Sequence, residues 1–161
     1  MVRGGKPYPP ASVDEFVLLP GVVEGCARLK AAGYVLVVAT NQPDVGRRTQ
    51  SQAAVEAIHA HLCALVPIDR IEVCYDTGGE NPPSAFRKPA PGMLLRAARE
   101  LGIDLAGSWM VGDRWRDVDC GRAAGCRTIF IDGGYAEALH TQPDFTAPGF
   151  AAVVDIILAP R

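Results

Sequence analysis

The sequence predicts an α/β fold in which helices cover both faces of a parallel sheet. The prediction rests first on Trp109–Ile131, where a buried strand, an acidic turn, a helix closed by Gly125 and a second apolar run follow one another. It rests also on Tyr34–Ala39, a continuous apolar run typical of a strand buried on both faces of a parallel sheet. Helices alternate with apolar strands along the whole chain, which predicts a doubly wound, Rossmann-like architecture.

Length and composition predict a single globular domain spanning residues 1–161. A chain of 161 residues buries roughly two-thirds of its unfolded surface, and 48% hydrophobic with 21% charged residues is ordinary for a globular protein. The net charge of −2, without a basic block, favours neither nucleic acid nor a membrane as a partner. Residues 1–7 lack the apolar segment of a signal peptide, so we expect a cytoplasmic protein.

The cysteines and histidines predict neither disulfides nor a metal site. No two of the five cysteines form a Cys-x-x-Cys pair, and we interpret them as reduced, mostly buried small hydrophobes. His59 and His61 lie two residues apart on a predicted helix, so their side chains point in different directions.

The first half of the chain shows helix signals and apolar strand runs in turn. Pro is favoured in the first turn of a helix and Gly just after its end, and Ser or Thr followed by Gln indicates a helix start. The expected elements are an irregular arm at 1–12, a helix from Pro20-Gly21 to Gly33, the strand Tyr34–Ala39, a loop at 43–48, a helix from a Thr49–Gln52 capping box to about Val66, and a strand at Arg70–Tyr75.

The second half continues the alternation and leaves one element open. The expected elements are a loop at Asp76–Ala85, a helix at Met93–Glu100 closed near Gly102, a strand at Trp109–Val111, a helix at Asp119–Gly125, a strand at Thr128–Ile131, a turn at Gly133-Gly134 and a loop at Asp144–Pro148. Phe150–Leu158 is apolar throughout and is compatible with a helix or a strand.

Polar residues gather where the predicted strands end. Thr40 and Asn41 follow one strand, Asp113 and Asp117 follow another, and Lys88 lies in a loop before a helix. Open α/β sheets place ligands at the carboxyl ends of their strands. A hydroxyl, a fixed cation and two carboxylates suited to Mg²⁺ are what phosphoryl transfer requires. Taken singly, each has a plainer interpretation: a carboxylate that caps a helix, a solvated lysine or a strand-end threonine.

Three ordered motifs resemble the haloacid dehalogenase (HAD) superfamily. They are VLVVATNQ at Val35–Gln42, RKPAPGM at Arg87–Met93 and VGDRWRD at Val111–Asp117, and the resemblance extends from about Lys6 to Asp132. It is greatest to the branch that contains heptose bisphosphate and histidinol-phosphate phosphatases. The resemblance implies a Mg²⁺-dependent phosphomonoester hydrolase that acts on a small sugar phosphate, such as a heptose 1,7-bisphosphate. No segment between the predicted strands is long enough for a separate cap domain.

The resemblance also implies roles for individual residues. Thr40 and the Asn41 backbone would bind the transferred phosphoryl group, and Lys88 would steady the charge on the nucleophile. Asp113 would bind Mg²⁺, while Asp117 would assist the metal site or orient the lysine. In the implied mechanism an aspartate attacks phosphorus, and water then cleaves the aspartyl phosphate.

The chain departs from the family pattern in two places. The family opens with a central strand ending in Asp-x-Asp-Gly, whereas Asp14 and Glu15 follow no apolar run. We therefore expect the central first strand and the nucleophile to be missing, the neighbouring strand edges to be bare and turnover to be slight. Of the branch's zinc-binding cysteines only Cys74 has a counterpart, and one soft ligand cannot hold a structural zinc. We expect Mg²⁺ and no zinc.

Other functions remain open. The chain is also compatible with a histidinol-phosphate phosphatase, or with a non-catalytic relative that binds phosphate or another protein. A receiver-like or nucleotide-binding domain is less favoured, because no P-loop or Gly-x-Gly-x-x-Gly follows any strand.

The resemblance also implies a substrate contact, in which Arg87 would hold a second phosphate or the far end of the substrate. The expected partner is a small phosphorylated metabolite, bound by a monomer or weak dimer.

Overall fold

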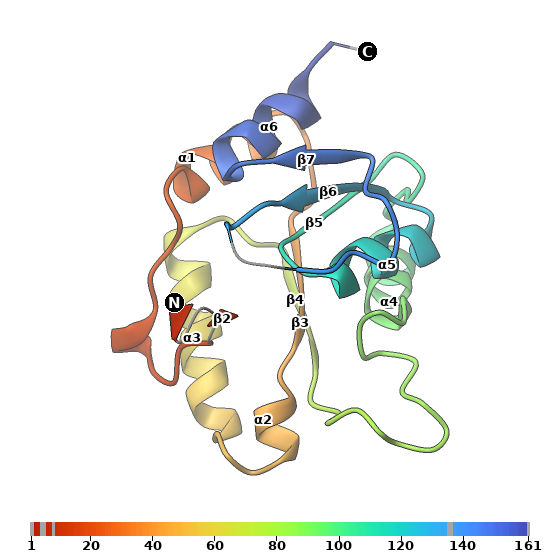
Figure 1. Cartoon of the computed structure of the whole chain (residues 1–161). Helices are drawn as coiled ribbons and strands as arrows, with labels where there is room; N and C mark the ends of the chain where they lie inside the picture. The colour runs from red at the N-terminus through yellow and green to blue at the C-terminus, as the bar shows by residue number, and fades with distance from the viewer. Residues whose placement is uncertain (1, 4–5, 8, 135–136, 161) are drawn as a thin grey trace.

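The computed structural model describes residues 2–3, 6–7, 9–134 and 137–160. Figure 1 shows helices and strands alternating along the chain, as predicted. The elements are β1 (Val2–Arg3), β2 (Lys6–Pro7), the 3₁₀ turn η1 (Val13–Glu15), α1 (Val22–Ala31), β3 (Val37–Asn41), α2 (Pro43–Gly46), α3 (Gln52–Leu65), β4 (Arg70–Cys74), α4 (Gly92–Leu101), β5 (Trp109–Gly112), α5 (Trp115–Ala124), β6 (Arg127–Ile131), β7 (Phe145–Ala147) and α6 (Phe150–Leu158).

The parallel strands form two sheets rather than one. β3 pairs in parallel with β4, with Val38 opposite Ile71. β5, β6 and β7 form a second parallel sheet, in which Val111 lies opposite Ile129. Among the described residues no strand lies between β3 and β5, so each of these strands is paired along one edge only.

Helices cover both faces of the strands, as predicted. α1 and α6 lie side by side at one end of the molecule (Figure 1) and share a face with α3. α4 packs against β3 and β4, and α5 packs against β5 and β6. No helix in the described part of the chain combines the length and apolarity needed to cross a membrane.

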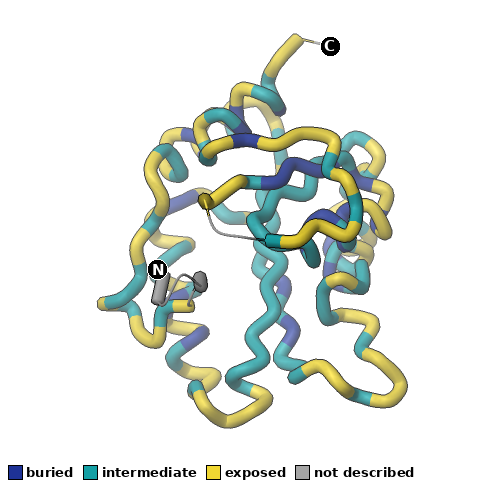
Figure 2. The backbone as a smooth tube through the Cα atoms, viewed as in Figure 1, coloured by how far each residue is buried: buried dark blue, intermediate teal, exposed yellow. Residues whose placement is uncertain are grey.

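The apolar core lies between α1, α6 and the β5–β7 sheet. Leu29 of α1 and Ile129 of β6 are almost fully buried there, together with three side chains of α6. Figure 2 shows the dark buried segments concentrated on β6 and the neighbouring helices. The open question at Phe150–Leu158 is settled as a helix, because its buried residues recur at helical spacing, namely Val153, Val154 and Ile157.

Three helices end at the glycines predicted to close them. Gly33, Gly102 and Gly125 follow α1, α4 and α5 with φ values of +88°, +67° and +82°. Only glycine adopts this left-handed conformation without steric cost. Pro20, expected in the first turn of α1, instead precedes the Gly21 cap.

The strand prediction at Tyr34–Ala39 was wrong in its bounds and its burial. β3 begins at Val37, opposite Arg70, and continues through Asn41. Its five residues are half-buried rather than buried on both faces. The reason is the lack of a partner strand on one edge, where a cavity lies instead.

Five loop and helix assignments also differ from the sequence prediction. Ser51, rather than Thr49, caps α3, because its hydroxyl accepts a hydrogen bond from Ala54 N at 3.1 Å. The predicted loops at 43–48 and 144–148 contain α2 and β7, the arm at 1–12 contains the paired strands β1 and β2, and α5 begins at Trp115 rather than Asp119. β7 is a strand because it pairs with β6, which its own sequence does not indicate.

The cysteines give a prediction for thiol chemistry. Four of them are buried, which confirms the expectation of mostly buried cysteines, and Cys63 on α3 is exposed. Burial raises the pKa of the Cys120 thiol to about 12, and a protonated thiol is a poor nucleophile. We expect a disulfide reagent at pH 8 to modify one thiol rapidly in the native protein and all five after unfolding. Rapid loss of a second thiol would contradict the burial of the other four.

Asp69 gives a prediction for the pH dependence of stability. Its carboxylate accepts hydrogen bonds from Lys30 Nζ at 2.8 Å and from Leu36 N at 2.7 Å. The lysine, and then the amide, hold the pKa of Asp69 below its ordinary value. A carboxyl group whose pKa is lower in the folded than in the unfolded protein stabilises the fold. This contribution is fully present above the unfolded pKa of about 3.9 and is lost as pH falls through the folded pKa.

We therefore expect Asp69→Asn to destabilise the protein by about 1 kcal/mol at neutral pH. The difference from wild type should shrink below about pH 4. Urea unfolding of both proteins across this range measures it. A difference that stays constant down to pH 2 would show that the charge of the carboxylate contributes nothing.

Candidate active site

Four of the predicted site residues meet at one cavity of about 500 Å³ between β3 and β5. Thr40 is the last residue but one of β3, Lys88 lies in the loop before α4, and Asp113 and Asp117 follow β5. The cluster therefore forms at the carboxyl ends of two parallel strands, where α/β sheets place ligands.

Lys88 is held in place through both its main chain and its side chain. Asn41 Oδ1 accepts from Lys88 N, and Asn41 Nδ2 donates to Lys88 O, both at 3.0 Å. The lysine ammonium donates to Ala39 O and to Asp117 Oδ1, each at 2.6 Å. The lysine side chain is 13% exposed and the aspartate 8%. This lysine is an ordered, largely buried cation rather than a solvated loop charge.

Asp117 both pairs with the lysine and caps a helix. Its Oδ2 accepts a hydrogen bond from Arg114 N at 3.1 Å, which satisfies an amide at the start of α5. A Cβ atom on Gly112 would lie 2.3 Å from the same oxygen, so only glycine fits there. The capping interpretation and the lysine-orienting interpretation are thus compatible, because each uses a different oxygen.

Thr40 and Arg87 occupy different surroundings. Thr40 Oγ1 accepts a hydrogen bond from Gln42 Nε2 at 3.3 Å and lines the cavity. Arg87 does not line it: its Nη1 donates to Asp76 O at 2.6 Å, in the loop that follows β4. Ser84 Oγ bonds to the Asp76 carboxylate in the same loop. The guanidinium therefore braces this loop.

Two groups that matter at this site have no sequence signal. Glu137 Oε1 accepts from Arg114 Nε at 3.1 Å and from Trp115 N at 3.0 Å, which ties a distant loop to the start of α5. The Ala39 carbonyl, which accepts from the lysine, belongs to an apolar strand residue. Residue type and spacing do not show either contact, because both depend on tertiary approach.

The charges of the cluster favour a divalent cation. The cluster contains two carboxylates and one ammonium, and a phosphate dianion bound beside carboxylates is stabilised by a cation between them. The described residues contain no group of three His, Cys, Asp or Glu side chains that could hold a metal. Mg²⁺ needs no such group, because it keeps several waters and binds one or two carboxylates together with substrate phosphate. The donor chemistry therefore suits Mg²⁺ held through Asp113.

These features together define a hydrolase of the HAD type. They are a lysine paired with a buried aspartate, a threonine at the end of a strand, and a second aspartate after a parallel strand. Comparison with known proteins agrees, and the chain belongs to the HAD hydrolase family. The family model described as HAD-hydrolase-like matches residues 85–153.

Similar proteins include heptose bisphosphate phosphatases. The D-glycero-β-D-manno-heptose-1,7-bisphosphate 7-phosphatase of Pseudomonas aeruginosa is 37% identical over 126 residues, which are 76% of this chain and 71% of the relative. The D-glycero-D-manno-heptose-1,7-bisphosphate 7-phosphatase of Thermosynechococcus vestitus is 34% identical over 173 aligned positions, covering 92% of this chain and 88% of the relative.

A solved structure extends the likeness to the whole fold. The crystal structure of D,D-heptose 1,7-bisphosphate phosphatase from Bordetella bronchiseptica, complexed with magnesium and phosphate, superposes with a TM-score of 0.75. The sequences are 32% identical, and the match covers 92% of this chain and 87% of that chain.

Proposed function

We propose that residues 1–161 form one domain of a Mg²⁺-dependent phosphomonoester hydrolase for a small sugar bisphosphate, namely a heptose 1,7-bisphosphate. The observation that supports it best is the buried Lys88–Asp117 pair, which lies beside Thr40 at the carboxyl ends of two strands. The names of the relatives and the magnesium and phosphate bound in the Bordetella enzyme support the substrate and the ion.

In this proposal each residue has a role that follows from its contacts. The hydroxyl of Thr40 and the backbone of Asn41 bind the phosphoryl oxygens, and Lys88 steadies the charge on the nucleophile and on the phospho-enzyme. Asp113 holds Mg²⁺, which would supply positive charge to the phosphate. Asp117 orients the lysine through Oδ1 and caps α5 through Oδ2, and it assists the metal site from that position.

The proposed covalent chemistry needs one more carboxylate. Around the cavity the described residues supply Asp113 and Asp117 as carboxylates, and both have roles already. We propose that the attacking aspartate comes from a segment outside residues 1–161. A small phosphorylated metabolite as the only partner, a cytoplasmic location and a monomeric or weakly dimeric state stay predictions, as does the lack of zinc.

The test has a binding arm and a catalytic arm. Phosphate with Mg²⁺ should bind to the 161-residue chain, and Thr40→Val should weaken that binding. A variant extended at its N-terminus by an apolar strand ending in Asp-x-Asp-Gly should release phosphate from heptose 1,7-bisphosphate faster than from histidinol phosphate. The unextended chain should show little turnover.

Metal dependence is the sharpest prediction for this activity. In the extended variant, Asp113→Asn should reduce the rate by roughly 100-fold or more, because the developing charge on phosphate loses its cation. Chelation of divalent ions should have a similar effect. Full activity after chelation would refute the metal assignment. Phosphate binding without hydrolysis in the extended variant would favour a non-catalytic phosphate-binding relative.

A further inference from the structure

A nearly buried glutamate holds the start of α5. The Glu137 side chain is only 8% exposed, and it belongs to the loop between β6 and β7. Its Oε1 accepts hydrogen bonds from Trp115 N at 3.0 Å and from Arg114 Nε at 3.1 Å. A carboxylate that is almost out of water is costly unless such partners compensate it. Because one oxygen accepts both bonds, the glutamate fastens this loop to one short segment.

The two hydrogen bonds act where the helix lacks partners of its own. The first N–H groups of an α-helix have no acceptor within the helix, and Trp115 is the first residue of α5. The amide before it, Arg114 N, is capped by Asp117 Oδ2. The helix dipole also favours negative charge at this end. Two successive donors are therefore satisfied by two carboxylates, one from the helix itself and one, Glu137, from a distant loop.

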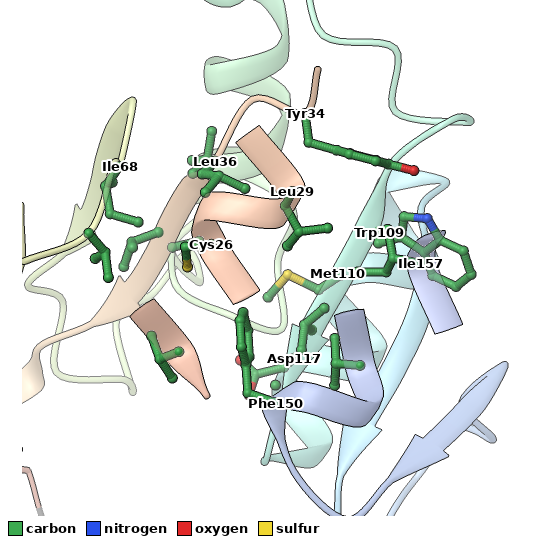
Figure 3. A pocket seen from close by; sticks show the side chains of 18 of the residues that line it. Cys26, Leu29, Tyr34, Leu36, Ile68, Trp109, Met110, Asp117, Phe150 and Ile157 are labelled. Atoms are coloured by element: carbon green, nitrogen blue, oxygen red, sulfur yellow. The ribbon is translucent and has the colours of Figure 1, made fainter. Parts of the chain in front are cut away.

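The same helix start carries two residues of the candidate active site. Asp113 directly precedes Arg114, and Asp117 is the third residue of α5. Figure 3 shows Asp117 among the side chains that line the cavity. Its Oδ1 accepts a hydrogen bond from Lys88 Nζ at 2.6 Å. A displacement of the first turn by about 1 Å would take this contact beyond hydrogen-bond distance.

Residues 137–144 form a strap along one face of α5. The His140 ring lies over Trp115 with the ring centroids 3.9 Å apart. Near the other end of the helix, Arg122 Nη2 donates to Gln142 O at 2.9 Å. Trp115 and Arg122 are seven residues apart, so they lie on the same face of the helix. The strap therefore has one attachment beside the active site and another that is remote from it.

We propose that Glu137 is a positioning residue for the active site. It fixes the first turn of α5 through the oxygen that the two donors share. Through this turn it keeps Asp117 on Lys88 and holds Asp113 at the cavity. The effect on the lysine is independent of the reaction at the site, whereas the effect on an ion at Asp113 rests on the proposed function.

The reactivity of Lys88 measures this positioning in the 161-residue chain. Acetic anhydride modifies a lysine as the neutral, accessible amine, so burial and an ion pair slow the reaction. In Glu137→Ala we expect the acetylation rate of Lys88 to rise at least about fivefold, the scale of one lost hydrogen bond, while that of Lys30 in α1 stays unchanged. Amide hydrogen exchange at Trp115 should accelerate at least about tenfold. Mass spectrometry and NMR give the two rates.

Two matched variants separate positioning from a general loosening of the strap. Arg122→Ala removes the remote attachment and should change the acetylation of Lys88 less than about twofold, because the first turn keeps its acceptor. Glu137→Gln retains an acceptor oxygen and should also stay within about twofold of wild type. Unchanged Lys88 reactivity in Glu137→Ala, an equal increase in Arg122→Ala, or a Gln variant as reactive as the Ala variant would overturn the proposal.

The consequence for the ion is measured in the N-terminally extended variant. There Glu137→Ala should weaken Mg²⁺ binding in the presence of phosphate at least about fivefold, and Arg122→Ala less than about twofold. Calorimetric titration gives both values. Unchanged Mg²⁺ affinity in Glu137→Ala would refute the role of the glutamate at Asp113. If the extended wild-type chain neither binds Mg²⁺ nor hydrolyses a phosphate ester, the proposed function is wrong, and the Lys88 and Trp115 rates still decide the positioning of α5.

Discussion

Replacing Lys88 by methionine is expected to destabilise the protein by about 3 kcal/mol and to abolish phosphate binding. The lysine and Asp117 are almost buried, and methionine keeps most of the apolar stem while removing the charge. An aspartate left without its cation in such a place is strongly destabilising, typically by about 3–5 kcal/mol. The Ala39 carbonyl loses its donor as well. Urea unfolding gives the stability, and calorimetric titration with phosphate and Mg²⁺ gives the binding.

The control for this prediction is an exposed ion pair of the same kind. Arg28 and Asp155 lie 3.0 Å apart, but their side chains are 52% and 68% exposed. Arg28→Ala should therefore change stability by less than about 1 kcal/mol. In addition, Lys88→Met combined with Asp117→Asn should lose less stability than the two single variants added together, by at least about 1 kcal/mol. Strict additivity would show that the two charges do not stabilise each other.

The candidate site was predictable where its signal is local. Thr40 follows the apolar run Tyr34–Ala39, and Asp113 and Asp117 follow the apolar run Trp109–Val111 within six residues. Their convergence follows from parallel strands that end at the same edge of a sheet. The lysine is different: nothing in its loop shows burial, and its importance came from the family motif. The structure supplies the missing reason, since the Asn41 amide holds the lysine main chain and the Ala39 carbonyl holds its ammonium.

The strand errors have one physical cause. Tyr34, Val35 and Leu36 have the apolar character of a strand, but the parallel ladder with β4 begins only at Val37. In β7, by contrast, the short segment Phe145–Ala147 shows no strand pattern and becomes a strand through pairing with β6. Strand pairing depends on which edge of a neighbouring strand is available. The spacing of apolar residues along one sequence does not contain that information.

Gly112→Ala is expected to destabilise the protein by about 3 kcal/mol and to disturb the active-site cluster. The added methyl carbon would lie 2.3–2.4 Å from Oδ2, Cβ and Cγ of Asp117. That side chain cannot easily yield, because Lys88 holds one oxygen and Arg114 N the other. Overpacking of a rigid site typically costs about 1–3 kcal/mol, and loss of the ion pair adds to it. Urea unfolding and phosphate titration measure the two effects.

Two further variants identify steric conflict as the cause. Gly149 is also followed by a helix, but its backbone is extended and no atom lies within 4 Å of an added Cβ. Gly149→Ala should cost less than about 1 kcal/mol. In an Asp117→Gly background the three conflicting atoms are gone, so Gly112→Ala should add almost nothing. If its cost is the same in both backgrounds, then the backbone at Gly112, rather than the approach of the aspartate, requires glycine.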